Sequence, residues 1–253
     1  MLTTNIKFIN FQKKKRFNVS KILHSLLKEN NHVINSLRKN YKDSFDKKKI
    51  NHLQKKLDYR IIGMGGSTLG SQAIYDFLKK KIRKKFVFID NLNANNKKKK
   101  KNYNNLIISK SGNTIETIAN ANILIKKKDN NLFITENKES YLSLLAKKLK
   151  AEVIDHNNYI GGRYSVLSEV GMLPAELMGL NYKNFRQLNN LVKNKLFMKS
   201  LVSNVEATIY FLKSKKFNSV IINYDEQSIN LFNWYQQLVA ESLGKEKKGL
   251  LPI

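Results

Sequence analysis

The sequence predicts an α/β protein built on a parallel sheet, with one complete unit followed by the beginning of a second. Short apolar runs recur between Tyr59 and Ile154, and segments with helical periodicity separate most of them. This alternation is typical of a parallel sheet that helices cover on both faces. Only two prolines occur in 253 residues, so the interiors of most elements are expected to be unbroken.

Residues 1–57 are expected to form an N-terminal helical segment, because apolar residues such as Ile22, Leu26 and Val33 recur at helical spacing. Residues 58–183 would form the first domain and residues 184–253 a partial second one. The expected strands of the first domain begin at Tyr59 and cover 86–89, 106–108, 132–134 and 153–154. The helices expected between them cover 67–78, 114–125 and 138–149.

The second domain is expected to contain one long helix over 185–211, a strand over 219–223, a helix over 228–245 and a final strand over 250–253. Gly244 follows the last apolar turn of that helix, where a left-handed cap usually lies. Two strands and two helices are too few for a doubly wound domain. An unfinished second sheet would leave an apolar edge exposed around 220–222 and 250–253. We therefore expect the chain to aggregate or to recruit a partner.

Composition excludes several classes of function. The chain has no cysteine, which excludes disulfides and thiolate chemistry, and its four histidines lack metal-ligand spacing. No run of about 18 apolar residues indicates a membrane span, and the N-terminal residues do not resemble a secretory signal. A soluble cytoplasmic protein is therefore expected.

The formal net charge of +28 raises the alternative of a nucleic-acid binder. The lysine runs, such as Lys97–Lys101 and Lys126–Lys128, are scattered over predicted loops and helix ends and do not form one basic helix with interleaved aromatic residues. No specific nucleic-acid partner is expected. The charge should instead attract anionic substrates in general.

Two polar turns follow expected strands. GMGGSTLG (Gly63–Gly70) has the glycines that allow a ligand close to the backbone, and Ser67 is placed to cap the next helix. It lacks the glycine spacing of a dinucleotide site. SKSGNTIET (Ser109–Thr117) offers hydroxyls at the start of a helix, the chemistry of a phosphate pocket. Each turn alone could be a plain polar turn.

Two further segments supply charge. Gly161 and Gly162 precede Arg163, whose guanidinium could stabilise an oxyanion without losing a proton. In the last helix, Gln237 and Glu241 lie four residues apart and therefore on one face. A carboxylate near the end of a rigid helix suits a base that removes a proton from carbon. A surface arginine and a solvated glutamate are the alternatives.

Taken together and in this order, GMGGSTLG, SKSGNTIET, GGRYSVLS and QQLVAESLGK resemble the glucose-6-phosphate isomerase (phosphoglucose isomerase) family. The resemblance spans Gly63 to Lys245. It implies sugar-isomerase (SIS) domains, each a three-layer α/β sandwich around a parallel sheet, and a homodimer. It also implies reversible conversion of glucose 6-phosphate to fructose 6-phosphate through a cis-enediolate, without a metal or organic cofactor, in glycolysis and gluconeogenesis.

The resemblance also implies a role for each matching residue. The substrate phosphate would be held by Ser109, Lys110, Ser111 and Thr114. The sugar would be lined by Gly66 and Ser67, with Gln237 beside it. Arg163 would stabilise the enediolate oxygens, and Glu241 would move the proton between C1 and C2.

One departure from the family pattern is substantial. The family carries a ring-opening histidine and a lysine beyond the glutamate helix, and neither has a counterpart here, so the sequence resembles a C-terminally truncated isomerase. The alternative is a non-catalytic sugar-phosphate-binding protein of the same fold.

Overall fold

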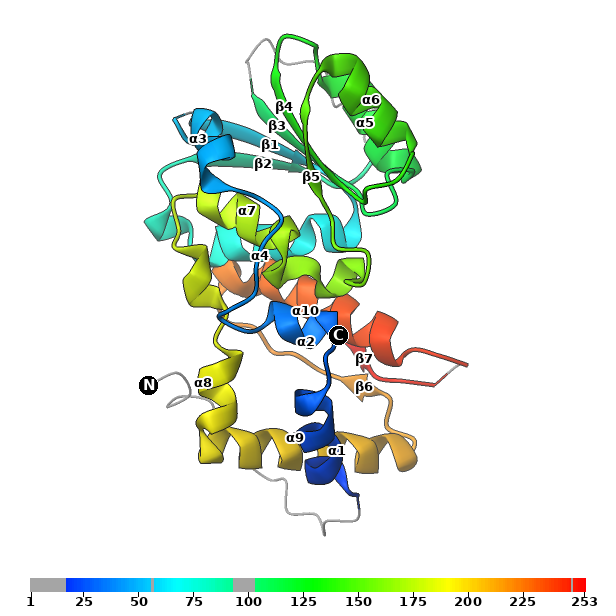
Figure 1. Ribbon diagram of the computed structural model, residues 1–253. Helices are drawn as coiled ribbons and strands as arrows, with labels where there is room; N and C mark the ends of the chain where they lie inside the picture. The colour runs from blue at the N-terminus through cyan, green and yellow to red at the C-terminus, as the bar shows by residue number, and fades with distance from the viewer. Residues whose placement is uncertain (1–16, 56, 93–102, 247) are drawn as a thin grey trace. The chain divides into compact units, whose positions relative to one another are not determined.

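The computed structural model describes residues 17–55, 57–92, 103–246 and 248–253 (Figure 1). The lysine run Lys97–Lys101 lies outside these ranges. The chain divides into two compact units. The sheet unit comprises Lys42–Tyr182 and Ile222–Leu238, and the helical unit comprises Met1–Tyr41, Lys183–Ile221 and Val239–Ile253.

The sheet unit contains a five-stranded sheet with the order β2-β1-β3-β4-β5, in which every neighbouring pair is parallel. The strands are β1 (Asp58–Ile62), β2 (Lys85–Ile89), β3 (Asn104–Ile108), β4 (Asn130–Thr135) and β5 (Glu152–Asp155). Each predicted apolar run falls within one of them, which confirms the α/β class and the parallel sheet. All five residues of β3 are buried, as expected for a central strand covered on both faces.

Helices lie on both faces of this sheet (Figure 1), giving three layers. On one face, α5 (Ile115–Leu124) and α6 (Tyr141–Leu149) pack on inward-pointing strand residues. The buried cluster there is Ile62, Ile107, Ala121, Leu124, Ile125, Phe133, Leu142 and Ala146. On the other face, α4 (Leu69–Phe77) places the Tyr75 ring 5.5 Å from Phe86 and 5.8 Å from Phe88.

Helix α7 (Glu169–Leu177) was not predicted from the sequence. All of its residues except Glu176 are buried, so it shows no polar face and no amphipathic period. Pro174 lies inside it, although proline is unfavourable in a helix interior. The helix packs beside α4 and begins directly after the GGRYSVLS motif, so it anchors that motif to the sheet unit.

The remaining elements of the sheet unit are α3 (Lys47–Gln54) and the first ten residues of α10 (Ile229–Leu243). Asn230 at the start of α10 donates a hydrogen bond to Asp76 of α4. Toward the other end of this segment, the Gln237 amide lies against Gly65. Because Gly65 precedes α4 and Asp76 is near its end, this part of α10 runs antiparallel to α4.

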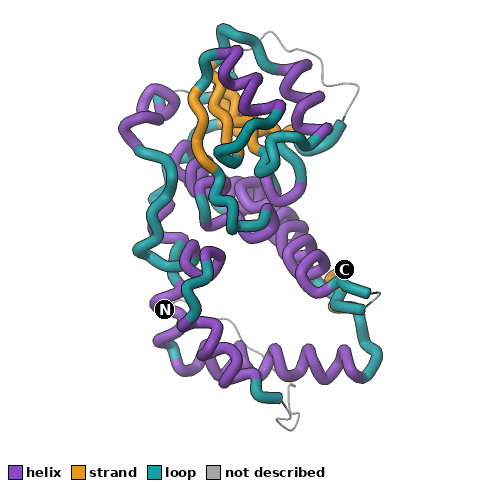
Figure 2. Tube along the Cα trace, turned by 45° about the vertical axis from the view of Figure 1, so that its right-hand side comes forward, coloured by secondary structure: helices purple, strands orange, loops and turns teal. Residues whose placement is uncertain are grey.

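The helical unit contains α1 (Val19–Lys28), α2 (His32–Ser36), α8 (Leu188–Lys193), α9 (Lys195–Lys213) and the end of α10, with a short parallel pair of strands, β6 (Asn218–Ser219) and β7 (Leu251–Pro252). Figure 2 shows how strongly helix predominates outside the five-stranded sheet. Val220, Leu251 and Ile253 are exposed, as predicted for this edge. The part of the chain that is described holds no helix long and apolar enough to cross a membrane.

Four local predictions were wrong. The strand expected over 219–223 is reduced to β6, which ends at Ser219, and 220–223 form no strand. The helix expected over 185–211 is two helices, because Asn194 ends α8 and its side chain accepts a hydrogen bond from Phe197 N, capping α9. Gly244 does not take a positive φ; the residues with positive φ after α10 are Glu246 and Gly249. Ser67 does not cap α4, since it lies in a 3₁₀ turn and Thr68 holds the cap position.

Candidate functional site

The candidate site begins where two neighbouring strands end. The glycine turn (Gly63–Gly66) follows β1, and the serine turn (Ser109–Thr114) follows β3. A Cβ atom placed on Gly63 would lie 2.9 Å from Ile108 O, so the two turns start side by side. With the strand order 2-1-3-4-5, they lie at the point where the connections reverse direction, which is where ligands bind to open α/β sheets.

A third turn, the arginine turn (Gly161–Arg163), packs directly on the glycine turn. A Cβ atom on Gly66 would overlap the Gly162 carbonyl group and come within 2.6 Å of Arg163 N. Ser165 Oγ donates a hydrogen bond to Gly162 O at 2.7 Å, which holds this turn in a short 3₁₀ segment. The absence of a side chain at Gly66 therefore allows the two backbones to touch.

Gln237 also reaches the glycine turn. Its Nε2 atom lies 2.8 Å from the position a Cβ atom would take on Gly65, and Gly65 has φ +53°. Both features require glycine at this position. The geometry thus brings together three sequence motifs and the glutamine of the fourth.

The serine turn is shaped by a pair of hydroxyl groups and one glycine. Ser109 Oγ lies 2.9 Å from Thr114 Oγ1. Gly112 has φ +67°, and a Cβ atom there would lie 2.6 Å from Ser140 Cβ. Ser109 is buried, whereas Ser111 is exposed and accepts a hydrogen bond from Asn113 N at 3.2 Å.

Helix α5 begins directly after this turn, with Thr114 at its cap position. The Thr114 hydroxyl pairs with Ser109 and does not accept a hydrogen bond from the first turn of α5. The first amide groups of a helix have no intrahelical partner, and together with the helix dipole they favour an anion. Hydroxyls and helix-start amides at one turn suit a phosphate group.

Lys110 is directed to a different set of partners. Its Nζ atom donates a hydrogen bond to Asn158 O at 2.7 Å and lies 3.5 Å from Glu136 Oε1. Glu136 is also paired with Lys138. Burial by itself would raise the pKa of the Glu136 carboxyl group. The two lysines outweigh burial, Lys138 with the larger effect and Lys110 with the smaller, so the pKa of Glu136 is lowered.

Two buried residues near the arginine turn were not proposed from the sequence. His156 directly follows β5 and is 2% exposed, with Nδ1 3.7 Å from Glu169 Oε1 and 3.0 Å from Asn157 O. Glu169, at the first position of α7 and 1% exposed, accepts a hydrogen bond from Asn157 N at 2.8 Å. Burial, the largest effect, lowers the pKa of His156. The position of His156 at the end of a predicted strand was the signal in the sequence.

The two predicted catalytic residues belong to different units. Arg163 is half-buried in the sheet unit, and its guanidinium carbon lies 4.7 Å from the centre of the Tyr164 ring. Glu241 is exposed and belongs to the helical unit, one helical turn after Gln237 on the same face of α10. Ser67, predicted to line the sugar, is half-buried in the 3₁₀ turn after Gly66.

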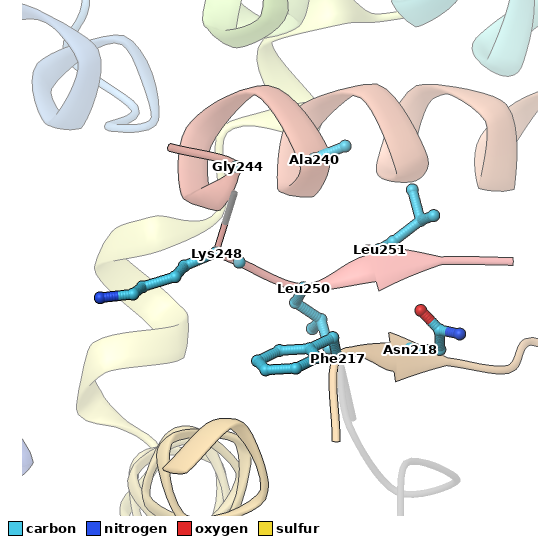
Figure 3. A pocket seen from close by; sticks show the side chains of 8 residues that line it. Phe217, Asn218, Ala240, Gly244, Lys248, Leu250 and Leu251 are labelled. Atoms are coloured by element: carbon cyan, nitrogen blue, oxygen red, sulfur yellow. The ribbon is translucent and has the colours of Figure 1, made fainter. Parts of the chain in front are cut away.

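A separate cavity of about 310 Å³ lies within the helical unit (Figure 3). It is lined by Phe217, Asn218, Ala240, Gly244, Lys248, Gly249, Leu250 and Leu251. No residue predicted to bind substrate is among these, and the lining is mainly apolar. Among the described residues, no group of three histidine or acidic side chains could hold a metal ion.

Three solved structures share the fold. A hypothetical protein of Thermus thermophilus superimposes with a TM-score of 0.71 at 20% identity, over 93% of this chain and 62% of that one. Tagatose-6-phosphate ketose/aldose isomerase from Escherichia coli gives a TM-score of 0.55 at 14% identity over 81% and 61% of the two chains. A putative tagatose-6-phosphate ketose/aldose isomerase from Clostridium novyi gives a TM-score of 0.57 at 20% identity, over 93% of this chain and 61% of that one. The SIS fold predicted from the motifs is therefore confirmed.

Sequence relatives are more specific. The glucose-6-phosphate isomerase of Methanocaldococcus jannaschii is 35% identical over 76% of this chain and 52% of its own length. The glucose-6-phosphate isomerase of Acholeplasma laidlawii is 33% identical over 76% of this chain and 51% of its own length. The chain thus spans about half the length of the curated relatives it matches. The family model for phosphoglucose isomerase matches residues 27–249, and the chain belongs to that family.

Proposed function

We propose that this chain functions in the reversible conversion of glucose 6-phosphate to fructose 6-phosphate. The observation that carries the proposal is the contact of three motif turns at the switch point of one sheet. Gly63 abuts the strand that ends in the serine turn, and Gly66 abuts the arginine turn. This arrangement supports a phosphate site and a guanidinium side by side, as a phosphorylated sugar requires.

In this proposal the serine turn holds the phosphate group through Ser109, Ser111, Thr114 and the amides that open α5. Hydroxyls and free amides suit the doubly charged phosphate because each donates a hydrogen bond to an oxygen. Gly66, Ser67 and Gln237 would line the sugar.

The proton transfer is proposed for Glu241. Its carboxylate would take a proton from C2 of the open-chain aldose and return it to C1, while the O2 hydroxyl loses its proton and O1 gains one, which leaves a ketone at C2. Arg163 would stabilise the negative charge that develops on the enediolate oxygens. The reaction as written needs no oxidant, because one carbon is oxidised as its neighbour is reduced.

A paired binding and turnover experiment tests this proposal. Calorimetry would measure fructose 6-phosphate binding to the chain, and a coupled dehydrogenase assay would measure its conversion to glucose 6-phosphate. Glu241→Gln should lower turnover by about 10²- to 10⁴-fold while leaving affinity within about twofold. Glu246→Gln, which removes the same charge five residues later, is the matched control and should leave turnover unchanged.

The outcomes separate the candidate functions. Binding with turnover that depends on Glu241 supports the isomerase. Binding without turnover would favour a non-catalytic sugar-phosphate-binding protein. A chain that neither binds nor converts the sugar phosphate would overturn the proposal.

The wider assignments are also proposals. We propose a cytoplasmic location, as the predicted role in glycolysis implies. We assign 58–183 to a complete SIS domain and 184–253 to part of a second one, and we expect a homodimer, as the family resemblance implies. The scattered lysines give no support to a specific nucleic-acid or membrane partner.

A further inference from the structure

We infer that Lys110 is a positioning residue that joins the serine turn to the segment leading into the arginine turn, and that it is not a direct phosphate ligand. The inference concerns contacts within the sheet unit. It rests on the proposed function only where it assigns chemistry to the two turns.

The contacts of the Lys110 ammonium group support this role. It donates a hydrogen bond to the main-chain oxygen of Asn158, 48 residues away in sequence, at 2.7 Å. It is also 3.5 Å from the Glu136 carboxylate, which is 9% exposed. An ammonium group held by a carbonyl and a carboxylate would have to leave both partners to bind phosphate, and the mostly buried Glu136 carboxylate would then keep only Lys138 of these two lysines.

The segment that Lys110 contacts is held from a second side. Glu169 Oε1 accepts a hydrogen bond from Asn157 N at 2.8 Å. Two successive residues are thus fixed by side chains from two different elements, the serine turn and α7. Asn158 precedes Arg163 by five residues, so its position sets the entry of the chain into the arginine turn.

The serine-turn backbone contributes to the same connection. Lys110 O accepts hydrogen bonds from Glu136 N at 3.1 Å and from Thr135 Oγ1 at 3.3 Å. The residue is therefore fixed at both its main chain and its side chain. A displacement of the serine turn would pull on Asn158 through a short, charge-assisted hydrogen bond.

Lys138 provides a matched control for Lys110. Both lysines pair with Glu136, but the Lys138 side chain, in the loop after β4, is the more exposed of the two. Lys110→Met and Lys138→Met remove the same charge from the same ion pair. Only the first removes the hydrogen bond to Asn158.

Amide hydrogen exchange on the full chain tests the inference without requiring activity. Lys110→Met should raise exchange at Tyr159 and Ile160 by about tenfold, because the loss of a charge-assisted hydrogen bond favours local opening. Lys138→Met should change it by less than about twofold. Glu136→Gln is a second variant and should raise exchange at the same amides by about threefold, since it frees Lys110 from one partner.

Titration with inorganic phosphate tests whether Lys110 is a direct phosphate ligand. Lys110→Met should weaken phosphate binding by less than about threefold, and Thr114→Val, which removes a serine-turn hydroxyl, by about tenfold. If the wild-type chain isomerises fructose 6-phosphate, Lys110→Met should lower kcat by about tenfold with KM nearly constant. The reason is that loss of the hydrogen bond to Asn158 would misplace Arg163.

Unchanged exchange in Lys110→Met would overturn the inference. So would a phosphate affinity that falls more in Lys110→Met than in Thr114→Val. Failure of the proposed function is a different result: the wild-type chain would bind no phosphate, and the exchange rates would still decide whether Lys110 holds the segment.

Discussion

Two glycines near Arg163 differ in the space around them. At Gly66 an added Cβ would strike the backbone of Gly162 and Arg163, which cannot move aside as a flexible side chain could. At Gly161 the nearest atom to an added Cβ is Tyr164 Cδ2 at 3.6 Å, an ordinary contact distance. Gly161 also has φ −68°, which any residue adopts.

This difference predicts unequal effects of one methyl group. Gly66→Ala should lower the free energy of unfolding by about 1–3 kcal/mol, because overpacking forces a backbone shift. Gly161→Ala should change it by less than about 0.5 kcal/mol. Urea unfolding of both variants measures the difference, and equal stabilities would show that the two turns do not touch as described.

His156 is a buried titratable residue that directly follows β5. It faces Glu169 of α7, and the charges of Lys110 and Glu136 also act on it. Burial holds its pKa below the ordinary value of 6.5, so the folded protein binds a proton less readily than the unfolded chain. The unfolded chain then takes up protons first as the pH falls, which favours unfolding.

We therefore expect stability to be retained above about pH 6.5 and to decrease as the pH falls from there toward the folded-state pKa of His156. His156→Gln should flatten this dependence, whereas substitution of the exposed His24 by Gln should leave it intact. Urea unfolding at several pH values between about 5.5 and 7.5 measures the slope. An unchanged slope in His156→Gln would assign the acid sensitivity to other groups.

At the scale of elements, the start of α6 is joined to the serine turn. Ser140 caps α6 by accepting a hydrogen bond from Ser143 N, and Ser143 Oγ accepts one from Ser140 N. Gly112 lies directly against the Ser140 side chain, and its carbonyl accepts a hydrogen bond from Leu142 N. The helix start thus supports the shape of the turn.

A comparison of two capping residues tests this connection. Ser140→Ala and Asp46→Ala each remove a side-chain cap, of α6 and α3 respectively, and each should cost about 1 kcal/mol of stability. Only Ser140→Ala should also weaken inorganic phosphate binding, because Ser140 packs against the serine turn whereas Asp46 caps a helix in a different part of the sheet unit. Equal phosphate affinities would mean that the turn keeps its shape without the cap.

At the scale of the whole molecule, the helical unit presents a sheet of two short strands. Among the described residues β6 pairs only with β7, and Val220, just beyond β6, is 69% exposed. A sheet edge with unpaired main-chain groups and apolar side chains favours association with another chain. The net charge of +28 opposes association, but this repulsion is screened at ordinary salt.

We expect the 253-residue chain to self-associate at about 0.15 M salt, where the Debye length is about 8 Å. Val220→Lys should reduce the association, because a lysine directly beside an edge strand opposes edge pairing. Ile22→Lys adds the same charge at a residue that is 66% exposed on α1 and should have little effect. Light scattering after size exclusion measures the mass, and a monodisperse wild-type monomer would contradict the expectation.

The sequence by itself determined the five strands, their order of appearance and the turns that carry polar groups. The strands are visible as short apolar runs because helices cover both faces of the sheet, and the amphipathic helices are visible because their apolar residues recur with the helical period. The family followed from four motifs in order. That Gln237 and Glu241 lie on one face of a helix could be predicted from the helical repeat alone.

Only the tertiary structure decided what depends on contacts between distant segments. Helix α7 has no polar face, because it is buried on nearly all sides, so no period indicated it. The partner of Lys110 lies 48 residues away, and Gly66 meets Gly162 across almost one hundred residues. A local sequence pattern indicates which side of an element is buried. Which atoms cover that side is decided only when separate elements pack together.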